Sequence, residues 1–175
     1  DEQAWRRPRG RDGVVYQARA VNPRIRDWHG KRIWVIGASS GIGQATAERL
    51  HALGATVALS ARSAASLQGG VSGMARAIAL PLDVTDHDSV KKAGERIVRE
   101  WGGFDLVLLV AGGYNEMRAD AFDLHSANAL VDLNLRGAFN CMDVVLPQLL
   151  RQGAGGIGIV ASVAGFGGLP KALVY

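Results

Sequence analysis

The chain has 175 residues, of which 48% are hydrophobic and 21% are charged, values that are ordinary for one globular domain. A single cysteine, Cys141, excludes an intramolecular disulfide and a cysteine-rich metal site. No apolar run approaches the roughly 18 residues of a membrane-spanning helix. We therefore expect a cytoplasmic protein without a membrane span.

Positive charge is concentrated near the N-terminus. Residues 1–32 carry eight arginines and one lysine against four acidic residues, a net charge of +5, whereas the whole chain carries +4. A basic arm can bind nucleic acid or an anionic surface, but the rest of the chain offers no basic stripe. The simpler interpretation is a solvated, flexible arm over residues 1–30. We expect no nucleic-acid partner and a folded domain over residues 31–175.

Strand and helix patterns alternate from Arg32 onward. The sequence predicts strands over residues 32–36, 55–61, 77–82, 105–110 and 157–161. It predicts helices over residues 44–53, from the N-cap Asp86 to Trp101, and over 126–152, the last bent near Gly137 and Pro147. Residues 63–76, small and polar, could hold a short helix, but we expect a loose connection. This alternation predicts an α/β fold, a Rossmann-type doubly wound parallel sheet with helices on both faces.

A glycine-rich turn follows the first expected strand and precedes the first expected helix. It reads Gly37-Ala38-Ser39-Ser40-Gly41-Ile42-Gly43. Glycines let the backbone turn tightly and approach a pyrophosphate, and a helix N-terminus offers free N–H donors. An ordinary strand-to-helix turn is the alternative. A strand before and a helix after are the context of a dinucleotide-binding turn, so the sequence predicts nucleotide binding.

The G-x-x-x-G-x-G turn resembles the cofactor signature of the short-chain dehydrogenase/reductase family, and the resemblance covers residues 30–175. The other matches, in chain order, are Asp83-Val84 in LDVTD, Ala111-Gly112 at the end of a segment matching N-N-A-G, Asn134 in LNLRGAF, Ser162 in VASVAG, and Tyr175, 13 positions after that serine. Each residue alone has an ordinary structural explanation, but their order and spacing together favour the family. The resemblance implies a cofactor site lined by Gly37, Ser39, Ser40, Gly41, Ile42, Gly43, Arg62, Asp83, Val84, Ala111 and Gly112.

The end of the second expected strand bears on the choice of nicotinamide cofactor. An acidic residue there bonds the ribose hydroxyls of NAD and repels a 2′-phosphate. Ala61 occupies that place and Arg62 follows it. A guanidinium can pair bidentately with a phosphate, and Ser39 and Ser40 can add hydrogen bonds. We therefore favour NADP(H) over NAD(H), with a solvated Arg62 as the alternative.

The resemblance also implies a mechanism. Tyr175 would be the acid/base, Ser162 would orient the substrate oxygen, and Asn134 would support a proton-relaying water chain. The expected activity is that of a carbonyl–alcohol oxidoreductase acting on a small molecule. The alternative is a catalytically inactive nucleotide-binding sensor or scaffold with the same fold. The family pairs through its long helix, so a homodimer or homotetramer is expected.

Two departures from the family pattern stand out. Leu109-Val110 replaces the two asparagines of N-N-A-G, which puts side-chain anchoring of that strand in doubt. The chain also stops at Tyr175, before the lysine that the family places four residues after its tyrosine and before its last strands. We therefore expect a longer natural protein, and little catalysis from these 175 residues alone.

Overall fold

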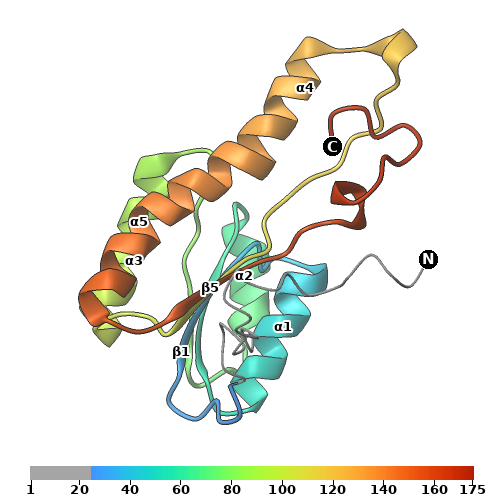
Figure 1. Cartoon of the computed structure of the whole chain (residues 1–175). Coiled ribbons are helices and arrows are strands. Elements are labelled where there is room, and N and C mark those ends of the chain that lie inside the picture. The colour runs from blue at the N-terminus through green and yellow to red at the C-terminus, as the bar shows by residue number, and fades with distance from the viewer. Residues whose placement is uncertain (1–24) are drawn as a thin grey trace, which may run out of the picture.

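The computed structural model describes residues 25–175, so most of the predicted basic arm lies outside the described residues. Residues 25–175 form five strands and five α-helices, which alternate except that α4 and α5 follow each other (Figure 1). The strands are β1 (Arg32–Ile36), β2 (Thr56–Ser60), β3 (Ala77–Ala79), β4 (Leu106–Leu109) and β5 (Gly156–Ile159). The helices are α1 (Gly41–Ala52), α2 (Ala64–Val71), α3 (His87–Trp101), α4 (Leu124–Val131) and α5 (Gly137–Gln152).

The strands form one parallel sheet in the order β3-β2-β1-β4-β5. The chain leaves β1 toward one edge through β2 and β3 and then returns to add β4 on the other side of β1. The direction of winding therefore reverses between β1 and β4. In open α/β sheets, ligands bind at the carboxyl ends of the strands at such a reversal.

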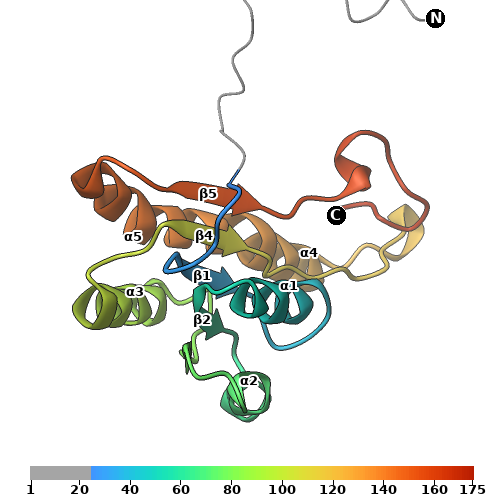
Figure 2. The same cartoon turned by 90° about the horizontal axis from the view of Figure 1, so that it is seen from below.

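Helices cover both faces of the sheet, as predicted. Figure 2 shows α1 on one side of the strands and α3 and α5 on the other. Side chains alternate along β1, so that Trp34 and Ile36 belong to the core cluster under α3 and α5, whereas Ile33 and Val35 belong to the cluster under α1 and α2. Both clusters are buried, which confirms the doubly wound α/β fold expected from the sequence.

Helix α3 begins and ends as its sequence predicts. The carboxylate of its N-cap Asp86 accepts hydrogen bonds from the backbone N–H groups of Asp88 (3.0 Å) and Ser89 (3.3 Å). Gly102 ends the helix at φ +75°, a left-handed conformation that favours glycine. Asp86 thereby fixes the start of α3 just after the Asp83–Val84 loop.

Residues 63–76 are not a loose connection, and this expectation was wrong. Helix α2 occupies residues 64–71, and the hydroxyl of Ser63 caps it by accepting from the N–H of Ser66 at 3.2 Å. Leu67 is fully buried between α2 and the sheet. One buried leucine in a segment of small residues gives too weak a periodicity to predict a helix.

The long helix expected over residues 126–152 begins two residues earlier and has three parts. Asp123 caps α4, a π-helical turn spans Asp132–Arg136, and α5 follows from Gly137. In the turn the N–H of Gly137 reaches the carbonyl of Asp132, five residues back. A π turn inside an α-helix often marks a functional position, and Asn134 lies within this one.

Candidate functional site

The glycine-rich turn packs directly against the end of β4. Gly37 has φ +98°, and a Cβ on it would lie 2.3 Å from the backbone nitrogen of Ala111. A Cβ on Gly43 would lie 2.0 Å from the carbonyl oxygen of Gly37. The N–H groups of Val110 and Ala111 both donate to the carbonyl of Ile36 at 2.8 Å. Glycine is therefore required at both positions for the turn to close on itself and on β4.

Helix α1 starts from this turn with an open N-terminus. Its N-cap Ser40 makes no side-chain capping hydrogen bond, and no acidic residue lies in the first turn. Gly41 has φ +56°, and a Cβ there would meet nothing within 4 Å. The first N–H groups of α1 and the Ser40 hydroxyl are thus available to an anion.

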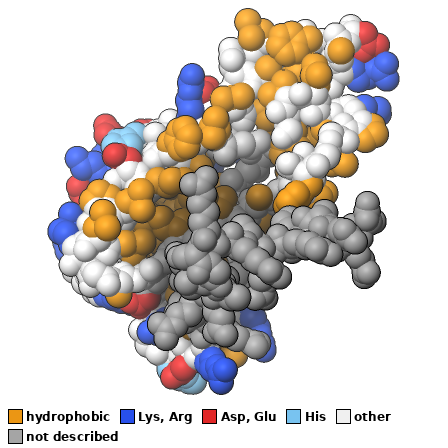
Figure 3. Space-filling view, viewed as in Figure 1, with side chains coloured by type: hydrophobic (Ala, Val, Ile, Leu, Met, Phe, Trp, Pro, Cys, Tyr) orange, Lys and Arg blue, Asp and Glu red, His pale blue; other side chains and the backbone are white. Residues whose placement is uncertain are grey.

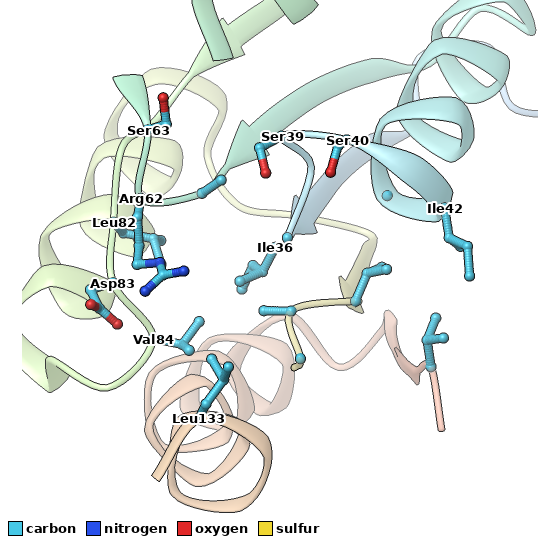
Figure 4. A pocket seen from close by; sticks show the side chains of 17 residues that line it. Ile36, Ser39, Ser40, Ile42, Arg62, Ser63, Leu82, Asp83, Val84 and Leu133 are labelled. Atoms are coloured by element: carbon cyan, nitrogen blue, oxygen red, sulfur yellow. The ribbon is translucent and has the colours of Figure 1, made fainter. Parts of the chain in front are cut away.

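Two further loops reach the same space from the ends of β2 and β3. Figure 4 shows Arg62 turned into the cavity, with Asp83 and Val84 near it and with Ser39 and Ser40 along the adjacent edge. Within residues 25–175, Arg62 makes no salt bridge. Its exposed guanidinium is therefore free to meet a ligand anion.

The Asp83–Val84 loop is held by its neighbours. The Asp83 carboxylate accepts from the N–H (2.9 Å) and hydroxyl (2.8 Å) of Thr85. The side-chain amide of Asn140 donates to the carbonyl of Val84 at 2.9 Å. The absence of a side chain at Gly137 admits Val84, because a Cβ there would lie 2.7 Å from a Val84 methyl. Helix α5 thus sets the position of this loop.

Asn134 joins the π turn to the chain after β4. Its amide oxygen accepts from the N–H of Gly113 at 2.8 Å, and its amide nitrogen donates to the carbonyl of Gly113 at 2.9 Å. Both ends of the side-chain amide are thereby occupied. These bonds anchor the segment after β4. The N-N-A-G segment has asparagines at the positions of Leu109 and Val110, and they would otherwise help to hold it. Leu109 instead packs in the core.

Ser162 and Tyr175 line the second part of the site. Ser162 follows β5, and its hydroxyl oxygen accepts from the N–H of Ala164 at 3.2 Å. That contact leaves the hydroxyl hydrogen free to donate. Tyr175 is partly exposed, and its ring meets the ring of Tyr114 edge-on, with centroids 5.2 Å apart.

These elements enclose two adjoining cavities at the carboxyl ends of the strands. The first, about 720 Å³, is lined by ten of the eleven predicted cofactor residues, all except Gly41. The second, about 590 Å³, is lined by Asn134, Ser162 and Tyr175. Eight residues line both cavities: Ile36, Ile42, Val84, Val110, Ala111, Gly112, Leu133 and Val160. The structure therefore brings the predicted cofactor and catalytic residues to one continuous site.

Several residues at the site were not predicted as site residues. The first cavity is also lined by Ser63, Leu82, Leu133 and Val160. The apolar members carry no chemical signal in the sequence, and only their places at strand and helix ends identify them. Tyr114 lines the second cavity, but no feature of the sequence around it marks it as a site residue.

The chemistry of the lining fits a dinucleotide rather than a metal. Within residues 25–175 there is no cluster of three metal-ligating side chains. Burial raises the pKa of the Cys141 thiol to about 12, which keeps it a neutral thiol beside the second cavity. The cradle closed by Gly37 and Gly43, and the open start of α1, suit a pyrophosphate. Across residues 25–175, helices with the length and apolar character needed to cross a bilayer are absent.

The fold and site define a Rossmann-type dinucleotide-binding protein. Residues 31–175 match the sequence profile of the short chain dehydrogenase family, and the chain belongs to that family. An uncharacterized oxidoreductase of Staphylococcus aureus strain N315 is 30% identical over 143 residues, 81% of this chain and 62% of the relative. An uncharacterized oxidoreductase of Listeria innocua is 34% identical over 149 residues, 83% of this chain and 60% of the relative.

A solved structure agrees with this family. The crystal structure of a protein from Sinorhizobium meliloti, assigned by its name to the short-chain alcohol dehydrogenases, has a TM-score of 0.80 and 31% identity to this chain. The match covers 85% of this chain and 61% of that protein. The chain thus spans about three-fifths of the length of the curated relatives and of the solved structure.

Proposed function

We propose that the protein is an NADP(H)-dependent oxidoreductase that interconverts a small carbonyl compound and its alcohol. The proposal rests on one observation: two sets of residues lie together where the direction of winding reverses, between β1 and β4. The glycine-rich turn, Arg62 and the Asp83–Val84 loop line one cavity, and Ser162 and Tyr175 line the adjoining one. A cofactor in the first cavity would extend toward a substrate in the second.

The preference for NADP(H) rests on Arg62. Ala61, at the end of β2, lines the cavity where an acid would repel a 2′-phosphate. The guanidinium of Arg62 and the hydroxyls of Ser39 and Ser40 line the same cavity (Figure 4). Guanidinium and hydroxyl donors together match the acceptor oxygens of a phosphate monoester.

The catalytic roles rest on the second cavity. A bound nicotinamide supplies or accepts the hydride. Tyr175 donates a proton to the carbonyl oxygen in the reduction and takes it back in the oxidation. The free hydroxyl hydrogen of Ser162 donates a hydrogen bond to the same oxygen. Asn134 acts as a positioning residue, because its amide holds the backbone of Gly113 beside the cavity.

The exposed apolar side chains along the long helix support association of two copies. Leu135, Phe139, Leu146 and Leu150 are all at least 44% exposed, and Figure 3 shows hydrophobic side chains gathered over α4 and α5. Burial of such a face in a homodimer or homotetramer would remove it from water. The proposal includes a cytoplasmic location, which suits a lone buried thiol.

The experiment that tests the cofactor preference compares Arg62→Ala with Arg99→Ala. Arg99 is an exposed arginine on α3 outside both cavities, so the two variants carry the same net charge. We expect Arg62→Ala to weaken NADPH binding by roughly 10- to 100-fold, the effect of losing charge-assisted hydrogen bonds at an exposed site. NADH binding should not change. Fluorescence titration with each nucleotide measures both affinities.

Three outcomes decide the proposal. If Arg62→Ala lost affinity for NADPH and NADH equally, the 2′-phosphate assignment would be contradicted. It would also be contradicted if Arg99→Ala lost as much NADPH affinity as Arg62→Ala. Turnover is followed by the absorbance of reduced nicotinamide with a panel of aldehydes and ketones. NADPH binding that Arg62→Ala weakens, without turnover of any carbonyl by the protein in its natural length, would favour a nucleotide sensor over an enzyme.

A further inference from the structure

The loop after β3 borders the cofactor cavity beside Arg62. Asp83 and Val84 both line that cavity, and Figure 4 shows them next to the Arg62 side chain. The proposed function assigns Arg62 to the 2′-phosphate, which is attached to the adenosine ribose of NADP(H). The Asp83–Val84 loop therefore lies where the adenosine half of the cofactor would bind.

Two polar groups of this loop are open to a ligand. Within residues 25–175 the N–H of Val84 donates to no acceptor, although Val84 is only 6% exposed. A backbone N–H on so buried a residue is usually paired. One oxygen of the Asp83 carboxylate accepts from Thr85, and the other has no partner within the same residues. The loop thus offers a donor and an acceptor on adjacent residues of the cavity wall.

Contacts inside the loop hold Asp83 but leave the backbone of Val84 free. The N–H of Asp83 donates to the hydroxyl of Ser89 at 3.3 Å, and the N–H of Asp86 donates to the carbonyl of Asp83 at 3.1 Å. Within residues 25–175 the backbone of Val84 makes one hydrogen bond, in which the side-chain amide of Asn140 donates to its carbonyl at 2.9 Å. Asn140 on α5 is therefore the polar contact that orients Val84.

Asn140 and Gly137 approach Val84 from the same face of α5. Residues three apart share a helix face, and Gly137 is buried whereas Asn140 is half-buried. The notch at Gly137 receives a Val84 methyl group, because a Cβ there would lie 2.7 Å from it. Apolar packing has no preferred direction, whereas a hydrogen bond does. The notch thus places the Val84 side chain, and the Asn140 amide sets the orientation of its backbone.

We propose that Asn140 is a positioning residue for the cofactor, which holds the backbone of Val84 in the conformation that meets the adenosine half. Asn140 lines neither cavity, so it acts through Val84. This role rests on the proposed function. Without the amide, only a fraction of molecules has the loop in the competent conformation, and the apparent affinity falls by that fraction. Because one hydrogen bond is lost, we expect a fall of roughly three- to tenfold.

The test compares Asn140→Leu with Asn128→Leu in the protein of natural length. Leucine is close to asparagine in size and lacks the amide, and Asn128 is an exposed residue of α4 outside both cavities. Fluorescence titration measures NADPH and NADH binding, and calorimetry measures adenosine 2′,5′-bisphosphate, which carries the adenosine half alone. Asn140→Leu should lose affinity for all three by the same factor, and Asn128→Leu should lose none. Arg62→Ala, in contrast, should leave NADH binding unchanged.

A second variant, Asn140→Asp, separates the hydrogen bond from packing. A carboxylate can only accept, so it would repel the carbonyl of Val84, whereas a protonated carboxyl group can donate to it. Asn140→Asp should therefore bind adenosine 2′,5′-bisphosphate more weakly than Asn140→Leu near neutral pH and more tightly as the pH falls toward about 4. Asp83 on the loop, His87 on α3 and its partner Asp143 on α5 also titrate, but they are present in every protein compared at a given pH.

Four outcomes would overturn the proposal. They are unchanged affinity in Asn140→Leu, an equal loss in Asn128→Leu, a larger loss for NADPH than for adenosine 2′,5′-bisphosphate, and binding by Asn140→Asp that never exceeds that of Asn140→Leu at low pH. Absence of nucleotide binding by the parent protein would contradict the proposed function instead. Hydrogen exchange of residues 83–86 would then still decide whether Asn140 holds the loop, because exchange should be faster in Asn140→Leu.

Discussion

Substitution of Gly37 by alanine tests the close contact between the glycine-rich turn and β4. An alanine at φ +98° costs about 1–2 kcal/mol in backbone strain. Its Cβ would also lie 2.3 Å from the nitrogen of Ala111, and relief of such an overlap in a packed interior costs about 1–3 kcal/mol. We therefore expect Gly37→Ala to lower the free energy of unfolding by about 2–5 kcal/mol.

The control is Gly41→Ala in the same turn. Gly41 also has a positive φ, but its added Cβ would meet nothing within 4 Å, so only the strain of about 1–2 kcal/mol applies. Urea unfolding followed by circular dichroism gives both free energies. An equal loss in the two variants would refute the reasoning, because it would mean that the contact with Ala111 contributes nothing. Gly37→Ala should also weaken NADPH binding, since the turn must shift away from β4.

Three further predictions concern neighbouring features. Asn134→Ala removes both hydrogen bonds to Gly113 and should lower the free energy of unfolding by about 1–3 kcal/mol; hydrogen exchange should show faster opening of residues 113–118, and unchanged protection there would contradict the anchoring role. Burial alone would raise the pKa of Asp105, but its hydrogen bonds and ion pair with Arg32 outweigh burial and lower it. Above roughly pH 4, Asp105→Asn should therefore lower the free energy of unfolding by about 1 kcal/mol, after allowance for solvent screening. That difference should vanish in urea titrations as the pH falls through the lowered folded-state pKa, and a pH-independent difference would refute the ion pair's role. Phe139→Lys places a charge on the exposed face of α5 and should lower the oligomer fraction seen by light scattering; no change would argue against association through that face.

The sequence by itself determined the class of fold and the main parts of the site. The apolar runs at β1 and β4, the Asp86 cap and Gly102 are local signals, because burial, capping and left-handed φ each act on a few adjacent residues. The glycine-rich turn is equally local, since its function requires a strand, a turn and a helix in succession. For this reason the parallel sheet, and the gathering of the predicted cofactor residues around one cavity, could be predicted from the order of the residues alone.

Other features of the site were decided only by the tertiary structure. Helix α2 is stabilised by burying Leu67 against the sheet, a contact that leaves little periodicity in the sequence. The amide of Asn134 is used by Gly113, 21 residues away, so its role as an anchor depends on how the π turn meets the end of β4. Such pairings are set by packing between elements, which no single segment specifies.

Tyr114 shows the same limit most clearly. Its place in the sequence, next to two glycines, gives no sign of a partner, and its contacts with Lys171 and Tyr175 span 57 and 61 residues. They form because β4 and β5 are neighbours in the sheet, so the segments that leave their carboxyl ends run together. The sequence determined which residues can do chemistry, whereas the order of the strands decided which of them meet.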